Sequence, residues 1–141
     1  MDRNADTGTA PLRVLLVDGH PEVRAALLAM LDRAAIVGSV AAVGNVSAAL
    51  AFLRELRPDI VVCDPRTLPG RPTDIVTRLS GFGCPLVVHT SSVDEGEASA
   101  WERAGAAAVL LKGGKLSSLL AQLASSSRRS SATLEPADAA R

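Results

Sequence analysis

The sequence is poor in the residues that build many common binding sites. It has two cysteines, Cys63 and Cys84, which are too few for a disulfide framework or for a zinc site of their own. Aromatic residues make up 2% of the 141 residues and tyrosine is absent, which argues against a stacking platform for bases or sugars. Lys+Arg and Asp+Glu total 15 each, so the formal net charge is zero. A protein whose main task is to grip nucleic acid is therefore not expected.

Long hydrophobic stretches are also lacking. No apolar run approaches the ~20 residues that span a bilayer, and the N-terminus, MDRNADTGTAP, is polar and carries no apolar export segment. Hydrophobic residues make up 48% of the chain and charged residues 21%, the balance of a folded globular domain. We therefore expect a single cytoplasmic domain that contacts neither membrane nor nucleic acid.

Five short apolar runs alternate with helical patterns along the chain. Strands are expected at 12–17, 36–43, 60–63, 86–88 and 107–111. Helices are expected from Pro21, at 46–57, around 74–79, at 94–104 and around 116–123. Repeated strand–helix units imply an α/β fold with a parallel sheet and helices on both faces. This predicts a domain over 11–124, a flexible N-terminal tail over 1–10, and a disordered tail or linker remnant over 125–141.

Four polar residues come directly after expected strands: Asp18, Asp64, Thr90 and Lys112. In open parallel sheets the functional crevice lies at the carboxyl ends of the strands. Two facing carboxylates favour a cation such as Mg²⁺, and a lysine and a threonine suit a phosphate. Since a carboxylate can act as a nucleophile, the four residues indicate phosphoryl chemistry with one aspartate as acceptor. Ordinary structural roles stay open for each of them, such as an acid capping a turn or a solvated lysine.

The segments LRVLLVDGHPEVR, RPDIVVCD, PLVVHTS and AGAAAVLLKGG resemble, in order and spacing, the receiver domain of bacterial two-component response regulators. The likeness is greatest to receivers of the LuxR-type transcription-factor subfamily, and it covers about residues 11–124. It implies a flavodoxin-like, doubly wound parallel sheet of order 2-1-3-4-5. Because no further domain is expected after 124, the resemblance implies an atypical member without an output domain.

The resemblance also implies roles for particular residues. Asp64 would accept a phosphoryl group from a histidine kinase or phosphotransfer protein. Asp18, Asp64 and the backbone carbonyl of Arg66 would hold Mg²⁺. Thr90 would follow the phosphoryl group, and Lys112 would pair with it. The chain has 13 arginines but only two lysines, so a lysine at the end of the last strand supports this role independently.

The sequence departs from the family pattern at several positions. Gly19 stands where the family has a second acid that ligates the metal, and Pro65 has no N–H to offer a phosphoryl group. The loop DPRTLPG is one residue longer than usual, and Val109 replaces the aromatic switch residue. We therefore expect weak Mg²⁺ binding and slow or absent phosphorylation. Restoring the acid by Gly19→Asp is predicted to destabilise the protein without metal and to recover stability with Mg²⁺.

Several functions remain open from the sequence. The first is a non-enzymatic receiver that signals to an output partner, with a homodimer expected through the face formed by 94–104, 107–111 and the last helix. A second is a truncated or split LuxR-type transcriptional regulator, and a third is a pseudo-receiver that ignores phosphorylation. An FMN-binding flavodoxin is disfavoured because DGHPEVR lacks a hydroxyl- and glycine-rich phosphate loop. Trp101, where relatives commonly have a small residue, is expected to pack, alone or against a partner.

Overall fold

The computed structural model describes residues 11–127 and contains a five-stranded parallel sheet of order β2-β1-β3-β4-β5. The strands are β1 (Leu12–Val17), β2 (Val37–Val43), β3 (Ile60–Cys63), β4 (Leu86–Thr90) and β5 (Ala108–Leu111). The helices are α2 (Pro21–Asp32), α3 (Val46–Leu56), the short 3₁₀ turn η1 (Pro65–Thr67), α4 (Pro72–Ser80), α5 (Glu95–Ala104) and α6 (Leu116–Ser126). The predicted flavodoxin-like order 2-1-3-4-5 is confirmed.

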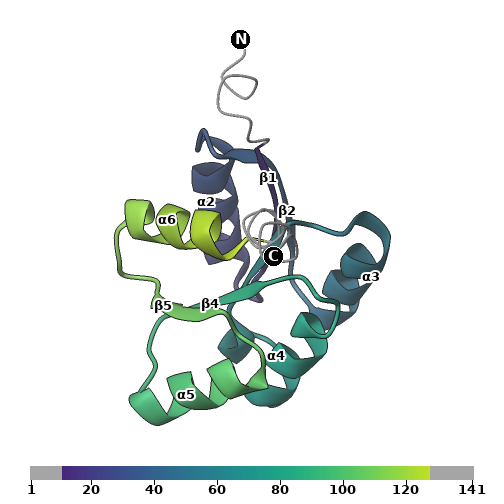
Figure 1. Cartoon of the computed structure of the whole chain (residues 1–141), viewed down its shortest axis with the longest axis vertical. Helices are drawn as coiled ribbons and strands as arrows, with labels where there is room; N and C mark the ends of the chain where they lie inside the picture. The colour runs from purple at the N-terminus through teal and green to yellow at the C-terminus, as the bar shows by residue number, and fades with distance from the viewer. Residues whose placement is uncertain (1–10, 128–141) are drawn as a thin grey trace, which may run out of the picture.

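Two helical layers enclose the sheet, with α2 and α6 on one face and α3, α4 and α5 on the other (Figure 1). Alternate residues of the central strands enter different cores. Val61 belongs to the cluster with α3, α4 and α5, whereas Val62 belongs to the cluster with α2 and α6. Because the sheet is covered on both faces, its central strands are apolar at nearly every position.

Local signals in the sequence set the ends of the helices. Pro21 is the first residue of α2, where its missing N–H is not needed. The Asn45 side chain accepts a hydrogen bond from Ala48 N at 2.8 Å and caps α3. Asp94 and Glu97 form a reciprocal capping box at the start of α5. Gly105 ends that helix at a φ of 130°, which favours glycine.

The structure extends two of the expected elements. Strand β4 continues through His89 and Thr90, because both side chains are buried and the strand pairs with β5 to its end. Helix α6 runs to Ser126, two residues beyond the boundary expected at 124. The tails predicted at 1–10 and over most of 125–141 lie outside the described residues. Within residues 11–127 no helix is both long enough and apolar enough to cross a bilayer.

Both cysteines are buried and neither forms a disulfide within residues 11–127, as expected from their places along the sheet. Cys63 pairs in register with Val88 near the carboxyl end of β4, whereas Cys84 precedes the start of that strand. Four residues of extended chain at ~3.3 Å each separate the two levels by about 13 Å. That separation exceeds the ~7 Å that a disulfide allows between Cα atoms.

Candidate functional site

The ends of the strands bring three of the four predicted residues into register at one edge of the sheet. The Asp18 N–H donates to the last carbonyl of β2 at 3.1 Å, and the Asp64 N–H donates to the last carbonyl of β1 at 3.0 Å. The Lys112 N–H donates to Thr90 O at 2.8 Å. Each of these residues therefore extends the pairing of its strand by one residue. This hydrogen bond fixes its backbone at the carboxyl end of the sheet.

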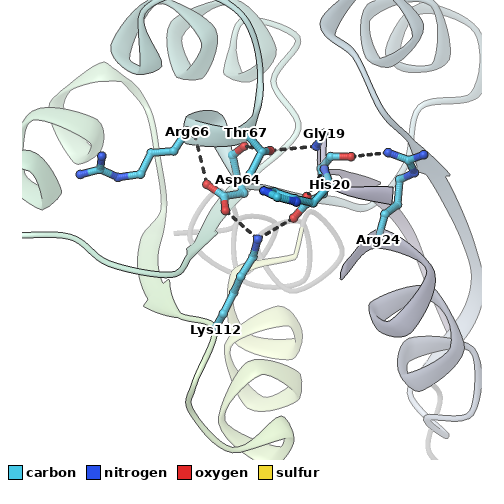
Figure 2. Close-up of polar contacts among 8 residues, drawn as sticks. Gly19, His20, Arg24, Asp64, Arg66, Thr67 and Lys112 are labelled. Carbon is cyan, nitrogen blue, oxygen red and sulfur yellow. Dashed lines mark hydrogen bonds and ion pairs between the residues drawn. The ribbon is translucent and has the colours of Figure 1, made fainter. Parts of the chain in front are cut away.

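The Lys112 ammonium joins the two aspartates. Its Nζ lies 2.8 Å from Asp18 Oδ2 and 2.6 Å from Asp64 Oδ2 (Figure 2). Asp18 and Asp64 are 1% and 3% exposed, so these ion pairs are shielded from water. Burial by itself lowers the pKa of Lys112, but the hydrogen bonds and negative charges of the two aspartates outweigh it, and the pKa is raised. The lysine therefore stays charged and binds both acids.

The remaining carboxylate oxygens are held by backbone donors. His20 N donates to Asp18 Oδ1 at 2.8 Å, and Arg66 N donates to Asp64 Oδ1 at 3.1 Å. Together with Lys112, these bonds give each of the four carboxylate oxygens a hydrogen bond. Both side chains are thus held in place by donors of this chain.

The Thr67 side chain lies beside Gly19. Its hydroxyl donates to Asp64 O at 2.7 Å and accepts from Gly19 N at 2.8 Å, which joins the two acid-bearing loops (Figure 2). A Cβ at residue 19 would overlap the Thr67 carbonyl oxygen and would lie 2.9 Å from its carbonyl carbon. Gly19 is therefore required by close packing rather than by a positive φ, because its φ is not in the left-handed region.

This packing corrects the expectation for Gly19→Asp. An acid at residue 19 has no room for its Cβ while the longer loop keeps its present course. We therefore expect the variant to lose stability through overlap with Thr67, a loss that Mg²⁺ does not restore. The two departures noted in the sequence, the glycine and the one-residue longer loop, are one structural feature.

Arg24 of α2 binds the loop that carries Asp18. Its Nη1 donates to Asp18 O at 2.7 Å (Figure 2). A Cβ at Gly44 would lie 2.6 Å from that same Nη1. The absence of a side chain at Gly44 leaves the space that the guanidinium fills. Arg24 therefore binds the carbonyl directly after β1 and lies close to Gly44, directly after β2.

Two buried polar side chains near the site lack partners. Thr90 Oγ1 and His89 Nδ1 have no hydrogen-bond partner within the part of the chain that the structure describes. Burial lowers the pKa of His89, and the Lys112 charge lowers it further against the opposing pull of Asp64 and Asp18. The histidine is therefore neutral at pH 7. A buried hydroxyl normally has a hydrogen-bond partner. The Thr90 hydroxyl can therefore bond with a group that enters the site.

The residues at this edge of the sheet fit a magnesium ion less well than a cluster of three acids would. No group of three or more His, Cys, Asp or Glu side chains that could hold a metal occurs among residues 11–127. Both oxygens of Asp18 and of Asp64 already accept hydrogen bonds, and the Lys112 ammonium supplies the positive charge. A metal ion would have to displace this lysine from both carboxylates.

The sequence missed two contributors to the site, Thr67 and Arg24. Both donate hydrogen bonds to backbone carbonyls, which no residue pattern indicates. Arg66 was expected for its backbone carbonyl, and the structure adds two contacts to it: its N–H donates to Asp64, and its side chain lies over Trp101. The only sequence signal for Thr67 was the length of the loop that contains it. Trp101 is 3% exposed, so its expected packing role is confirmed.

A doubly wound parallel sheet with two acids and a lysine at the carboxyl ends of its strands is the arrangement of a signalling receiver domain. The chain matches the family model of the response regulator receiver domain over residues 14–124, and it belongs to this family. Receiver domains are in general non-enzymatic signalling modules of two-component systems; they bind Mg²⁺ at the phosphorylation site and interact with histidine kinases or phosphotransfer proteins.

Solved structures of receivers share the fold at low sequence identity. A LuxR-family response regulator from Aurantimonas sp. SI85-9A1 is 24% identical, with a TM-score of 0.71 over 79% of this chain and 81% of its own. Chemotaxis protein CheY4 from Vibrio cholerae is 21% identical, with a TM-score of 0.74 over 83% of this chain and 99% of its own. The receiver domain of the putative regulator NarL from Mycobacterium tuberculosis is 20% identical, with a TM-score of 0.66 over 92% and 98%. A comparison with curated protein sequences gave no match.

Proposed function

We propose that this chain acts as a receiver that accepts a phosphoryl group on Asp64 and passes the change on through protein contacts. The donor is the phosphohistidine of a histidine kinase or phosphotransfer protein. Its P–N bond breaks as a P–O bond forms to the Asp64 carboxylate, and the imidazole leaves with the electron pair. The observation that carries the proposal is the Lys112 ammonium, 2.6 Å from Asp64, because it places a cation beside the group that gains negative charge.

The surroundings of Asp64 support roles for its neighbours. Thr90 is fully buried, and its hydroxyl has no partner among residues 11–127, so a phosphoryl oxygen would supply an acceptor. Lys112 can keep its contact with Asp18 while it turns from the Asp64 carboxylate toward the new phosphoryl group. Asp18 is thereby the group that holds the lysine in the site throughout.

We propose that the reaction is slow and that Mg²⁺ affinity is low. Mg²⁺ must compete with Lys112 for Asp18 and Asp64, with the Arg66 carbonyl as the third ligand that the resemblance implies. Loss of a supporting group alone costs ~10–100-fold in metal affinity, and here a direct ligand is replaced by Gly19. The amount of Mg²⁺ needed to raise the melting temperature, followed by differential scanning calorimetry, measures this affinity.

Mass spectrometry of the intact protein after incubation with acetyl phosphate and Mg²⁺ tests the acceptor. We expect slow, incomplete addition of one phosphoryl group, lost in Asp64→Asn and retained in Asp74→Asn, which changes an exposed acid in the first turn of α4. Label on the Asp64→Asn variant would refute the assignment of the acceptor. Fast and complete labelling would refute the slow reaction.

A second function, a receiver fold that signals without phosphorylation, is favoured by the close packing of Gly19 against Thr67, which leaves no room for a side chain at residue 19. Complete absence of label at Asp64 in the same experiment, with a folded protein, would select this second function.

With either function, we propose that α5, β5 and α6 form the output surface. This surface would contact an output partner or a second copy of the chain, as in a split LuxR-type regulator. Leu111 on this surface is 52% exposed. Sedimentation of the wild type against Leu111→Glu tests self-association there.

A further inference from the structure

Arg66 is held at both of its ends. Its N–H donates to Asp64 Oδ1 at 3.1 Å, while its side chain extends away from the site (Figure 2), pairs with Glu97 and lies over the Trp101 ring, 5.5 Å from the centroid. We infer that Glu97 and Trp101 of α5 position the Arg66 N–H on Asp64, and that a change at Asp64 reaches α5 by the same contacts. This deepens the proposed function, on which it rests in taking Asp64 as the place where the change occurs.

The backbone next to Asp64 makes the Arg66 N–H the first donor available. Pro65 follows Asp64 directly and has no N–H, so the next amide along the chain is that of Arg66. This amide lies in η1, for which the Asp64 side chain is the cap. A carboxylate that changes its charge or its orientation must therefore alter the bond that sets the start of η1.

The other end of Arg66 meets a part of α5 that is itself fixed. Glu97 Oε1 accepts from Asp94 N at 3.0 Å, and Glu97 N donates to Asp94 Oδ1 at 2.8 Å, so the capping box leaves Oε2 for Arg66. Trp101 lies one turn further along the helix, on the same side as Glu97. The contacts of Arg66 therefore span the first two turns of α5.

Arg66 covers the tryptophan that it contacts. The arginine is exposed, whereas Trp101 is 3% exposed, so its guanidinium lies between the ring and solvent. An exposed ion pair such as Arg66–Glu97 contributes little alone, but the cation–π contact with the buried ring adds to it. A residue that is two positions from Asp64 and touches α5 directly provides a short route between them. Since coupling between two sites is reciprocal, α5 must also affect the Arg66–Asp64 bond.

The first arm of the test follows Trp101, the only tryptophan of the chain, by acrylamide quenching of its fluorescence. Quenching of a buried indole requires its cover to open. Asp64→Ala removes the acceptor of the Arg66 N–H, and we expect the quenching constant to rise about fivefold, the lower end for coupled sites. The same change should have no effect in an Arg66→Met background. It should keep its full effect in the matched Arg103→Met background, which changes an exposed arginine of α5.

The second arm follows the coupling in the reverse direction and does not alter the buried site. Glu97→Gln should raise the hydrogen-exchange rate of the Arg66 amide about fivefold, whereas Glu102→Gln, an exposed acid on the same helix, should leave it unchanged. A general loss of stability would speed exchange of the buried strands as well, so those amides serve as the internal reference.

The inference is overturned if the Arg66 amide exchanges equally in Glu97→Gln and the wild type. It is also overturned if Asp64→Ala changes the quenching of Trp101 equally with and without Arg66. Should Asp64→Ala fail to fold by circular dichroism, the exchange arm decides alone. Neither arm uses a phosphoryl donor. Both arms therefore still test the coupling between Asp64 and α5 if Asp64 does not accept a phosphoryl group.

Discussion

Replacing Lys112 by methionine isolates the contribution of its ammonium to stability. Methionine is also a long, unbranched side chain, so the change removes the charge from a side chain that is 14% exposed while much of its apolar length remains. Asp18 and Asp64 would then be left buried without a cation. Removing one partner of a buried ion pair costs about 3–5 kcal/mol. Each aspartate keeps one backbone hydrogen bond, so we expect a loss near the lower end, ~3 kcal/mol.

Urea and thermal unfolding at pH 7 measure this loss. For a domain of this size 1 kcal/mol corresponds to about 3–5 °C, so the melting temperature should fall by roughly 10 °C or more. Lys115→Met is the matched control, because Lys115 is the other lysine of the chain and is exposed. A Lys112→Met protein that unfolds within ~0.5 kcal/mol of this control, the usual range for surface changes, would show that the ammonium does not hold the site together.

The same pair of proteins has an expected pH dependence. The pKa of Lys112 is raised in the folded protein, so its contribution to stability is fully present below the unfolded pKa. That contribution is lost as the pH rises through the folded pKa. The advantage of the wild type over Lys112→Met should therefore be constant around pH 7–9 and should shrink only in strongly alkaline solution.

Further changes test the packing and the buried groups. Gly19→Ala should cost about 1–3 kcal/mol by overlap with Thr67, whereas Gly113→Ala, with no atom within 4 Å of its Cβ, should be nearly neutral in the same urea melts; equal effects would contradict the packing argument. The pKa of His89 lies below its ordinary 6.5, so the unfolded state binds more protons and stability should fall as the pH drops below about 6.5. Urea midpoints should show this fall in the wild type and in the exposed variant His20→Gln, and less of it in His89→Leu. Both thiols are buried, so reaction with Ellman's reagent should require unfolding, and a fast native reaction would contradict it.

Most of the fold could be predicted because the signals are local. The apolar runs 12–17 and 60–63 end at the polar residues that follow β1 and β3, and the structure keeps both ranges. The end of β4 was placed too early, because His89 and Thr90 are polar, and only the tertiary structure shows that they are buried. Polarity marks a strand end only where the polar side chain reaches water.

The residues of the site could be predicted from the sequence, but the contact that joins its two acid-bearing loops could not. The order and spacing of Asp18, Asp64 and Lys112 indicate that they meet, and the structure brings them within hydrogen-bond distance. The contact between Gly19 and Thr67 joins residues 48 positions apart, and it depends on the path of a loop that is one residue longer. Gly19 and the Thr67 loop are far apart in the sequence and come into contact only in the folded protein.

That contact also restricts how this receiver can change by mutation. Any side chain at residue 19 would overlap the Thr67 carbonyl, and a loop that followed another course would leave the Gly19 N–H without the Thr67 hydroxyl that it now meets. Either change alone is therefore expected to give a less stable protein, whereas a side chain at residue 19 finds room only when the Thr67 loop changes with it. A side chain at residue 19 therefore requires a matching change 48 positions away in the sequence, so the two positions are expected to change together rather than one at a time.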